Sequence, residues 1–325
     1  MDLVVLGGTR FAGGFFTEAA LDAGHRVTVV HRGLTGRHRA PQAEHVFVDR
    51  VADPGLTPLA GRRFDAAVDF CGFFPRVVAG SADRLADASQ YVFVSSISAH
   101  RDPIPVGATE DAPVYEPPFP EREAITETTY GPLKVACERV VTDRFGVRAS
   151  IVRPGFIVGP TDPSDRFTSL VRRAAAGGTM VAPGPSDAPL QFVDARDLAA
   201  FLLRIVERGP VGIVDAVHPA GTATIGQVLE AARAAVGADT RIAWADPLRL
   251  SLALGPARES AFPLWDPDDR IGAFHRLAGS RAAAAGLRSR PIADTIADLV
   301  AWDAASGRPV YGLAPDREAA LLASL

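Results

Sequence analysis

A short apolar run that leads directly into a glycine-rich loop constrains the fold of this chain more than any other feature. Residues 3–6 are Leu-Val-Val-Leu, and residues 7–13 are Gly-Gly-Thr-Arg-Phe-Ala-Gly. An unbroken apolar run indicates a strand buried on both faces. Glycines after such a strand permit a tight turn, close approach of the backbone to a pyrophosphate and close packing of the next helix. The sequence therefore predicts a dinucleotide site at the first strand-to-helix turn.

Strands and helices alternate from the amino terminus to about residue 153. The predicted strands are Leu3–Leu6, Arg26–Val30, His45–Val48, Ala66–Phe70, Tyr91–Val94 and Ser150–Val152, and the predicted helices are the one that follows the glycine loop, Pro75–Ser89 and Thr128–Phe145. This order predicts an α/β fold with a doubly wound, parallel Rossmann sheet. Farther along, amphipathic spacing predicts helices at Asp194–Glu207, Thr224–Val236 and Ile292–Ala305.

The change in pattern near residue 153 predicts two domains. We expect a dinucleotide-binding Rossmann domain formed by residues 1–153 with residues from about 190 to 215. Residues from about 154 to 189 and from 216 to 325 are expected to form a smaller substrate-binding domain, most of it C-terminal.

Charge and composition narrow the class of partner. The formal net charge of −4 gives no general attraction to nucleic acid or to an anionic membrane. No apolar run approaches the ~18 residues that a membrane span needs, and no basic region precedes the first strand, so we expect no signal peptide. Cys71 and Cys137 lack the spacing of metal ligands. Reduced thiols, a cytoplasmic location and no bound metal are the resulting expectations.

A tyrosine and a lysine stand one helical turn apart at Tyr130 and Lys134. An ammonium close to a tyrosine hydroxyl favours the phenolate, which suits the tyrosine to acid–base catalysis. Ser95 and Ser96 end the predicted strand Tyr91–Val94, at the edge where open α/β sheets bind ligands. The three residue types indicate a redox or redox-assisted enzyme that acts on a carbonyl or a carbinol.

The ordered motifs resemble the extended, or atypical extended, short-chain dehydrogenases/reductases, a family of NAD-dependent epimerase/dehydratase-like proteins. The resemblance covers most of residues 1 to about 205, and it rests on residues 7–13, Ser95-Ser96, the Tyr130–Lys134 pair, Arg153-Pro154-Gly155 with Gly159-Pro160, and residues 193–198. It implies that Tyr130 is the general acid or base and that Lys134 assists it and binds the nicotinamide ribose. It also implies that Ser96 orients the carbonyl, and that a homodimer forms through the tyrosine helix.

The resemblance and the glycine loop together assign further site residues. The expected cofactor-binding residues are Gly7, Thr9, Arg10, Phe11, Ala12, Gly13, His31, Arg32, Asp49, Arg50, Phe70, Cys71, Gly72, Ser95, Lys134 and Pro154. The expected substrate-binding residues are Ser96, Ser98, His100 and Phe156. Asp49 and Arg50 match the family's adenine contact, whereas His100 either touches the substrate or caps a loop.

The end of the second strand bears on the choice of cofactor. An NAD site usually has Asp or Glu there to bind the ribose 2′-hydroxyl, but this chain has His31-Arg32-Gly33. Arg32 and Arg10, with Arg37 or Arg39 nearby, suit a 2′-phosphate. We therefore expect NADP(H), with NAD(H) possible.

Two positions depart from the pattern of family members that bind sugar nucleotides. Phe156 stands where many of them carry Asn, and Leu190 where they carry Arg; neither side chain can bond a diphosphate. We therefore expect an NADP(H)-dependent oxidoreductase that transfers hydride to or from a small, non-nucleotide carbonyl or hydroxyl substrate. The alternatives are a sugar or sugar-nucleotide epimerase or dehydratase, and a non-catalytic cofactor- or RNA-binding relative.

Overall fold

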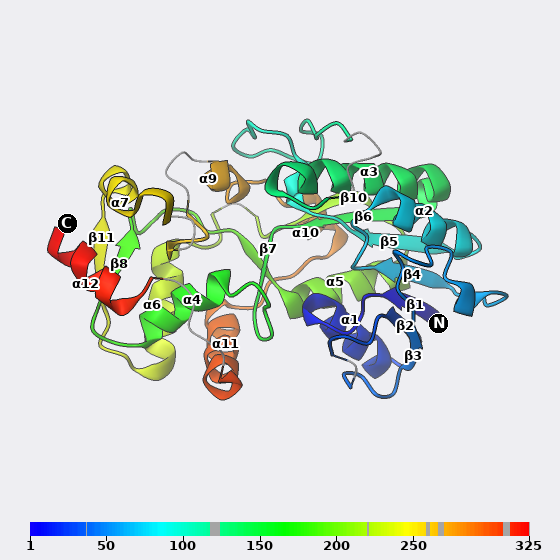
Figure 1. The fold of residues 1–325 in the computed structure, drawn as a ribbon, viewed down its shortest axis with the longest axis horizontal. Helices are drawn as coiled ribbons and strands as arrows, with labels where there is room; N and C mark the ends of the chain where they lie inside the picture. The colour runs from blue at the N-terminus through cyan, green and yellow to red at the C-terminus, as the bar shows by residue number, and fades with distance from the viewer. Residues whose placement is uncertain are drawn as a thin grey trace.

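A seven-stranded parallel sheet forms the centre of the protein in a computed structural model, which describes residues 1–36, 38–117, 124–219, 221–257, 261–265, 270–307 and 313–324 (Figure 1). Across the sheet the strands are β10 (Gly212–Ala216), β6 (Ala149–Pro154), β5 (Gln90–Val94), β4 (Ala66–Asp69), β1 (Asp2–Leu6), β2 (Arg26–His31) and β3 (Glu44–Phe47). The pairings between neighbours are parallel. The predicted doubly wound Rossmann sheet is confirmed.

Strand β1 shows why helices cover both faces of this sheet. Successive side chains of a strand point to opposite faces. Leu3 and Val5 pack in one cluster with α1 (Phe11–Asp22) and α5 (Ala195–Arg208). Val4 and Leu6 pack in another with α2 (Pro75–Arg84) and α3 (Glu127–Phe145). Figure 1 shows the two helix layers on either side of the sheet.

The predicted elements around this core agree closely with the structure, with one clear difference. Helix α2 ends at Arg84 rather than at Ser89, because Ala86 and Ala88 form turns back to Asp83 and Leu85. Helix α6 (Ile225–Val236) begins at the predicted cap Thr224.

The elements after β6 include several that the sequence did not predict. Short parallel pairs form between β7 (Phe156–Val158) and β9 (Phe192–Asp194) and between β8 (Thr179–Pro183) and β11 (Arg241–Ala245). The helices are α4 (Arg166–Ala175), α6, α7 (Pro247–Leu254), α9 (Arg270–Phe274), α10 (Ser280–Ala285), α11 (Ile292–Ser306) and α12 (Pro315–Ser324). In addition, 3₁₀ turns form at η1 (Thr57–Leu59), η2 (Ile97–Ala99), η3 (Gly146–Arg148) and η4 (Gly255–Ala257). Among the described residues, no helix has both the length and the apolar character needed to cross a membrane.

Asp194 joins the central sheet region to the C-terminal helices. It caps α5 by accepting from the backbone N–H of Arg196 at 2.8 Å, and it accepts from the Arg196 guanidinium and from the hydroxyl of Thr295 in α11 at 2.9 Å. Burial opposes the charge of Asp194, but the Arg196 and Thr295 hydrogen bonds hold the pKa of this carboxyl below its usual value.

We predict that Asp194→Asn lowers the free energy of unfolding at pH 7 by about 2–3 kcal/mol, since a buried charge partner is lost. Because the folded-state pKa of Asp194 is depressed, this contribution is present above the unfolded value of about 3.9 and is lost as pH falls through the folded value. Urea unfolding at pH 7 and at lower pH measures both effects. Asp143→Asn, an exposed control in α3, should change stability by about 0.5 kcal/mol or less. A gap between wild type and Asp194→Asn that stays constant as the pH falls toward 3 would contradict this account.

Candidate active site

A cavity of about 1150 Å³ runs along the carboxyl ends of the central strands. This is the edge at which open α/β sheets bind ligands. The predicted site residues that line it are Gly7, Thr9, Arg10, Phe11, Ala12, Gly13, His31, Arg32, Asp49, Arg50, Phe70, Cys71, Ser95, Ser96, Ser98, Tyr130, Lys134, Pro154 and Phe156. Gly72 and His100 are not part of this lining. The structure therefore gathers most of the residues that the sequence assigned to cofactor and substrate.

The turn between β1 and α1 is shaped to seat a phosphate group. Gly7 has a φ of +85°, and a Cβ added there would lie 2.9 Å from the Cβ and Sγ atoms of Cys71. A Cβ on Gly13 would lie 2.6 Å from the carbonyl oxygen of Gly7. Arg10 precedes α1 without a side-chain cap, so the first N–H groups of the helix remain available to an anion. These features fit the pyrophosphate of a dinucleotide.

Two arginines stand at the end of the cavity next to β2. Arg10 and Arg32 are exposed and line the cavity, and in the part of the chain that the structure describes neither has a hydrogen bond or ion pair through its guanidinium. Arg39 is different, because it pairs with Glu18 at 2.6 and 2.8 Å and lies over the ring of Phe15. The expectation that Arg39 serves a 2′-phosphate is therefore corrected, and Arg37 lies outside the described residues.

His31 and Asp49 shape the same end of the cavity. The N–H of Gly33 donates to Nδ1 of His31, so the proton of His31 lies on Nε2, which donates to His45 at 2.9 Å. The exposed Asp49 accepts from the backbone N–H of Val51 at 3.0 Å. Its second carboxylate oxygen makes it a suitable acceptor for an adenine amino group.

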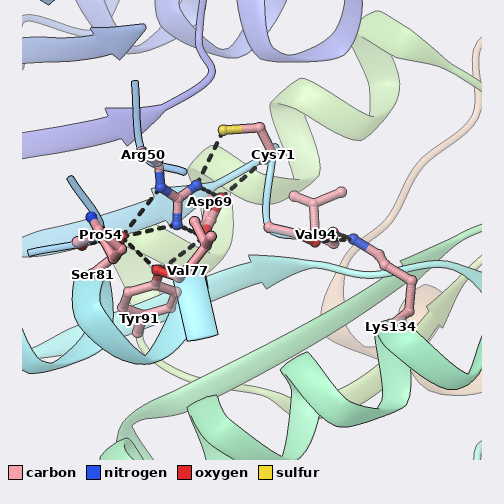
Figure 2. Close-up of polar contacts among 10 residues, drawn as sticks. Arg50, Pro54, Asp69, Cys71, Val77, Ser81, Tyr91, Val94 and Lys134 are labelled. Atoms are coloured by element: carbon pink, nitrogen blue, oxygen red, sulfur yellow. Dashed lines mark hydrogen bonds and ion pairs between the residues drawn. The ribbon is translucent and has the colours of Figure 1, made fainter. Parts of the chain in front are cut away.

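Arg50 lines this end of the cavity and belongs to a buried polar network (Figure 2). Its two terminal nitrogens each donate to one oxygen of Asp69 at 2.8 Å, and its guanidinium also donates to Ser81 and to the sulfur of Cys71. Tyr91 donates to Asp69 at 2.9 Å. The expected adenine contact of Arg50 stays a prediction: Arg50 lines the cavity, while Asp69, which is fully buried, holds its guanidinium.

The network fixes the ionisation of its members. Burial opposes the charges of Arg50 and Asp69, but their pairing holds the pKa of Asp69 below its usual value and that of Arg50 above. Burial, followed by the Asp69 charge, raises the pKa of Tyr91. Arg50 thereby ties the segments after β3 and β4 to Ser81 of α2, and Cys71 is held against the Gly7 turn.

Lys134 links helix α3 to the segments that follow β4 and end β5 (Figure 2). Its ammonium donates to the carbonyl oxygens of Gly72 at 3.0 Å and Val94 at 2.8 Å, and it lies 4.5 Å from the ring centroid of Phe93. The side chain is almost fully buried. An ammonium has three donors, so one remains for a ligand. Tyr130, on the same helix, lines the same cavity.

The serines after β5 have distinct partners. Ser96 accepts from the backbone N–H of Ser98 and donates to its hydroxyl, both at 3.1 Å, so Ser98 keeps its own proton for another acceptor. Ser95 instead donates to Glu138, which also pairs with Arg153 at 2.6 and 2.9 Å. Sequence reasoning missed Glu138. The available signal was its position one helical turn after Lys134, on the same buried face of the helix.

Gly131 allows the tyrosine helix to approach the serine turn. A Cβ at this position would lie 2.1 Å from the carbonyl oxygen of Ser98. Only glycine leaves room for this contact between α3 and η2, and Tyr130, the residue before it, lines the same cavity as the serines.

The substrate end of the cavity contains Phe156 but not two other residues considered from the sequence. Leu190 lines a separate cavity of about 410 Å³. His100 is fully buried, and its Nε2 lies 2.8 Å from a carboxylate oxygen of Asp215. The substrate-binding role expected for His100 is therefore corrected. Among the described residues, no group of three or more His, Cys, Asp or Glu side chains is placed to hold a metal ion.

Known proteins resemble this chain in sequence and in fold. The model of the NAD dependent epimerase/dehydratase family matches residues 76–215, which confirms the family resemblance. A curated relative, the chloroplast stem-loop binding protein of 41 kDa b from Arabidopsis thaliana, is 22% identical over 218 residues, which is 63% of this chain. The chain spans about half of that protein, 54% of its length.

Solved structures extend the likeness to nearly the whole chain. WbmH from Bordetella bronchiseptica, in complex with NAD+, has a TM-score of 0.68 and 19% identity, and the match covers 95% of this chain and 100% of that one. The UDP-N-acetylglucosamine 4-epimerase from Bacillus cereus has a TM-score of 0.64 and 16% identity, with 92% and 98% covered. At these identities the likeness shows the fold.

We predict that Gly131→Ala lowers kcat by roughly 100-fold, because the added methyl group displaces Tyr130 from the serines and a shift of about 1 Å is that costly. Cofactor affinity should change by about threefold or less, since the glycine turn is untouched. Steady-state kinetics and cofactor titration measure the two quantities. Gly55→Ala, where a Cβ meets only an atom at 3.8 Å, is the matched control. Full activity of Gly131→Ala would refute the proposed role of this contact.

Proposed function

We propose that this protein is an NADP(H)-dependent oxidoreductase of the NAD-dependent epimerase/dehydratase family, which acts on a small, non-nucleotide carbonyl or hydroxyl substrate. The observation that carries the proposal is one cavity lined by the glycine turn, Ser96, Tyr130 and Lys134. Bound nicotinamide would supply or accept the hydride. In this proposal residues 1–153 and about 190–215 hold the cofactor, and the other residues hold the substrate.

The protein's own side chains have defined tasks in the proposed reaction. In the reductive direction, Tyr130 donates its hydroxyl proton to the substrate oxygen as hydride reaches the carbonyl carbon. The ammonium of Lys134 has one N–H left after its bonds to Gly72 and Val94, and this N–H would donate a hydrogen bond to a ribose hydroxyl. The Ser96–Ser98 pair, linked at 3.1 Å, offers a hydroxyl donor to the substrate oxygen.

The preference for NADP(H) is the finer part of the proposal. Arg10 and Arg32 line the cavity next to β2 and suit a 2′-phosphate. The family description and the WbmH structure name NAD, so NAD(H) is the competing cofactor.

A second candidate is an epimerase or dehydratase, which the family match favours. Phe156 at the cavity wall is the observation that speaks against a nucleotide-sugar substrate. In an epimerase the hydride returns to the product, so the reduced-nicotinamide absorbance shows no net change, whereas a reductase consumes the cofactor stoichiometrically. The chloroplast relative is named as a stem-loop binding protein, and a third candidate is a non-catalytic cofactor- or RNA-binding protein, for which neither turnover nor a Tyr130 effect is expected.

We predict that Tyr130→Phe reduces turnover at least about 100-fold, because the proton donor is lost. Cofactor affinity should be preserved, since the ring is retained. Measurements of kcat and of the cofactor Kd separate the two effects, and Tyr115→Phe, which removes a hydroxyl bonded to Asp102, is the control. Retained activity in Tyr130→Phe would show that Tyr130 is not the proton donor.

We predict that the protein binds NADPH at least about tenfold more tightly than NADH, a difference of about 1.4 kcal/mol. Arg32→Gln should weaken NADPH binding and leave NADH binding nearly unchanged, because only NADPH carries the 2′-phosphate. Fluorescence titration of both cofactors measures the ratio, with Arg208→Gln, on an exposed part of α5, as control. A clear preference for NADH would overturn the prediction.

A further inference from the structure

Arg166 is a cation of the catalytic cavity that the proposed hydride transfer does not use. It is the first residue of α4, and it lines the cavity beside Phe156. Its guanidinium carbon lies over the Phe156 ring, 5.3 Å from the centroid. Throughout the described ranges, this guanidinium has no hydrogen bond or ion pair.

The other arginines of α4 show that this freedom is specific to Arg166. Arg172 pairs with Asp165 at 3.0 and 3.1 Å and with Asp303 at 2.6 and 2.7 Å. Arg173 pairs with Glu318 at 2.5 Å. Because Arg172 occupies both oxygens of Asp165, the acid adjacent to Arg166 in the sequence is already neutralised. The helix therefore presents to the cavity one guanidinium without an ion pair, and the nearby charge that acts on it is that of Asp162.

The surroundings of Arg166 define what it can bind. Phe156 contacts Arg166, and the lining of the same cavity also includes Ile157, Pro263 and Phe274, which favour an apolar body. Asp162 also lines the cavity and accepts from the backbone N–H and hydroxyl of Ser164 at 2.8 Å. A nearby acid disfavours a dianion more than a monoanion. A guanidinium stacked on a ring keeps its N–H edge open, and that edge matches the two oxygens of a carboxylate.

We propose that Arg166 is a specificity-determining residue that binds a carboxylate of the substrate. The substrate is thus an apolar compound that carries a carboxylate in addition to its reacting carbonyl or hydroxyl group. Phe156 holds the cation in place. This inference rests on the proposed function, because it takes the same cavity to be the substrate site.

The first test compares a keto acid with its uncharged counterpart. Phenylpyruvate and phenylpyruvamide differ only in the carboxylate, and NADPH consumption gives kcat/KM for each. Wild type should prefer the acid at least about tenfold, which corresponds to about 1.4 kcal/mol. In Arg166→Met the preference should vanish through loss of activity on the acid, while Arg166→Lys should retain part of it. Arg208→Met, at an exposed position at the end of α5, is the control and should behave as wild type.

The second test separates failure of this inference from failure of the proposed function. Calorimetry measures phenylacetate and phenylacetamide binding to each variant, with and without NADP+. Tighter binding of the acid that depends on Arg166 supports the inference even if neither keto compound is reduced, in which case only the proposed hydride transfer is in question. Equal or absent binding of the acid and the amide in wild type, or a preference that survives Arg166→Met, overturns the role of Arg166.

Discussion

The buried ammonium of Lys134 determines how the active site is assembled. A charged group withdrawn from water is costly unless it is well hydrogen-bonded. The carbonyl oxygens of Gly72 and Val94 supply those bonds, and they lie after β4 and at the end of β5. The lysine therefore fixes α3 against the carboxyl edge of the sheet. This attachment also sets the position of Tyr130, because Tyr130 precedes Lys134 by one turn of the same helix.

The two ends of the cavity differ in what they offer a ligand. Near β1 and β2 it provides a phosphate-seating turn and the cations Arg10 and Arg32. At that end, the charges of Arg50 and Asp69 neutralise each other in a buried ion pair. This pair stabilises the wall of the cavity. At the other end, the lining combines apolar side chains such as Phe156 with the guanidinium of Arg166 and the carboxylate of Asp162. This difference between the two ends of the cavity matches a phosphate-rich cofactor at one end and a largely apolar substrate at the other.

The parts of the site that the sequence predicted are those set by local spacing. The glycine turn and the Tyr130–Lys134 pair are short-range patterns, and both line the cavity. The contacts that the sequence did not predict join side chains whose partners are distant in sequence: Arg50 binds Asp69, 19 residues away, and His100 contacts Asp215, 115 residues away. No short-range sequence pattern predicts pairs that are so far apart in the chain. Strands β7 and β9 escaped prediction because three residues are too few to show a period.

The most direct test of the central claim is a crystal structure of the protein with NADP+. The account predicts that the pyrophosphate lies at the amino terminus of α1 against Gly7 and that Lys134 bonds the nicotinamide ribose. It also predicts that the nicotinamide C4 faces a space bounded by Tyr130 and Ser96, roughly 3–4 Å from where a substrate carbon would sit. A nicotinamide placed away from Tyr130, or a pyrophosphate bound away from the glycine turn, would contradict the account.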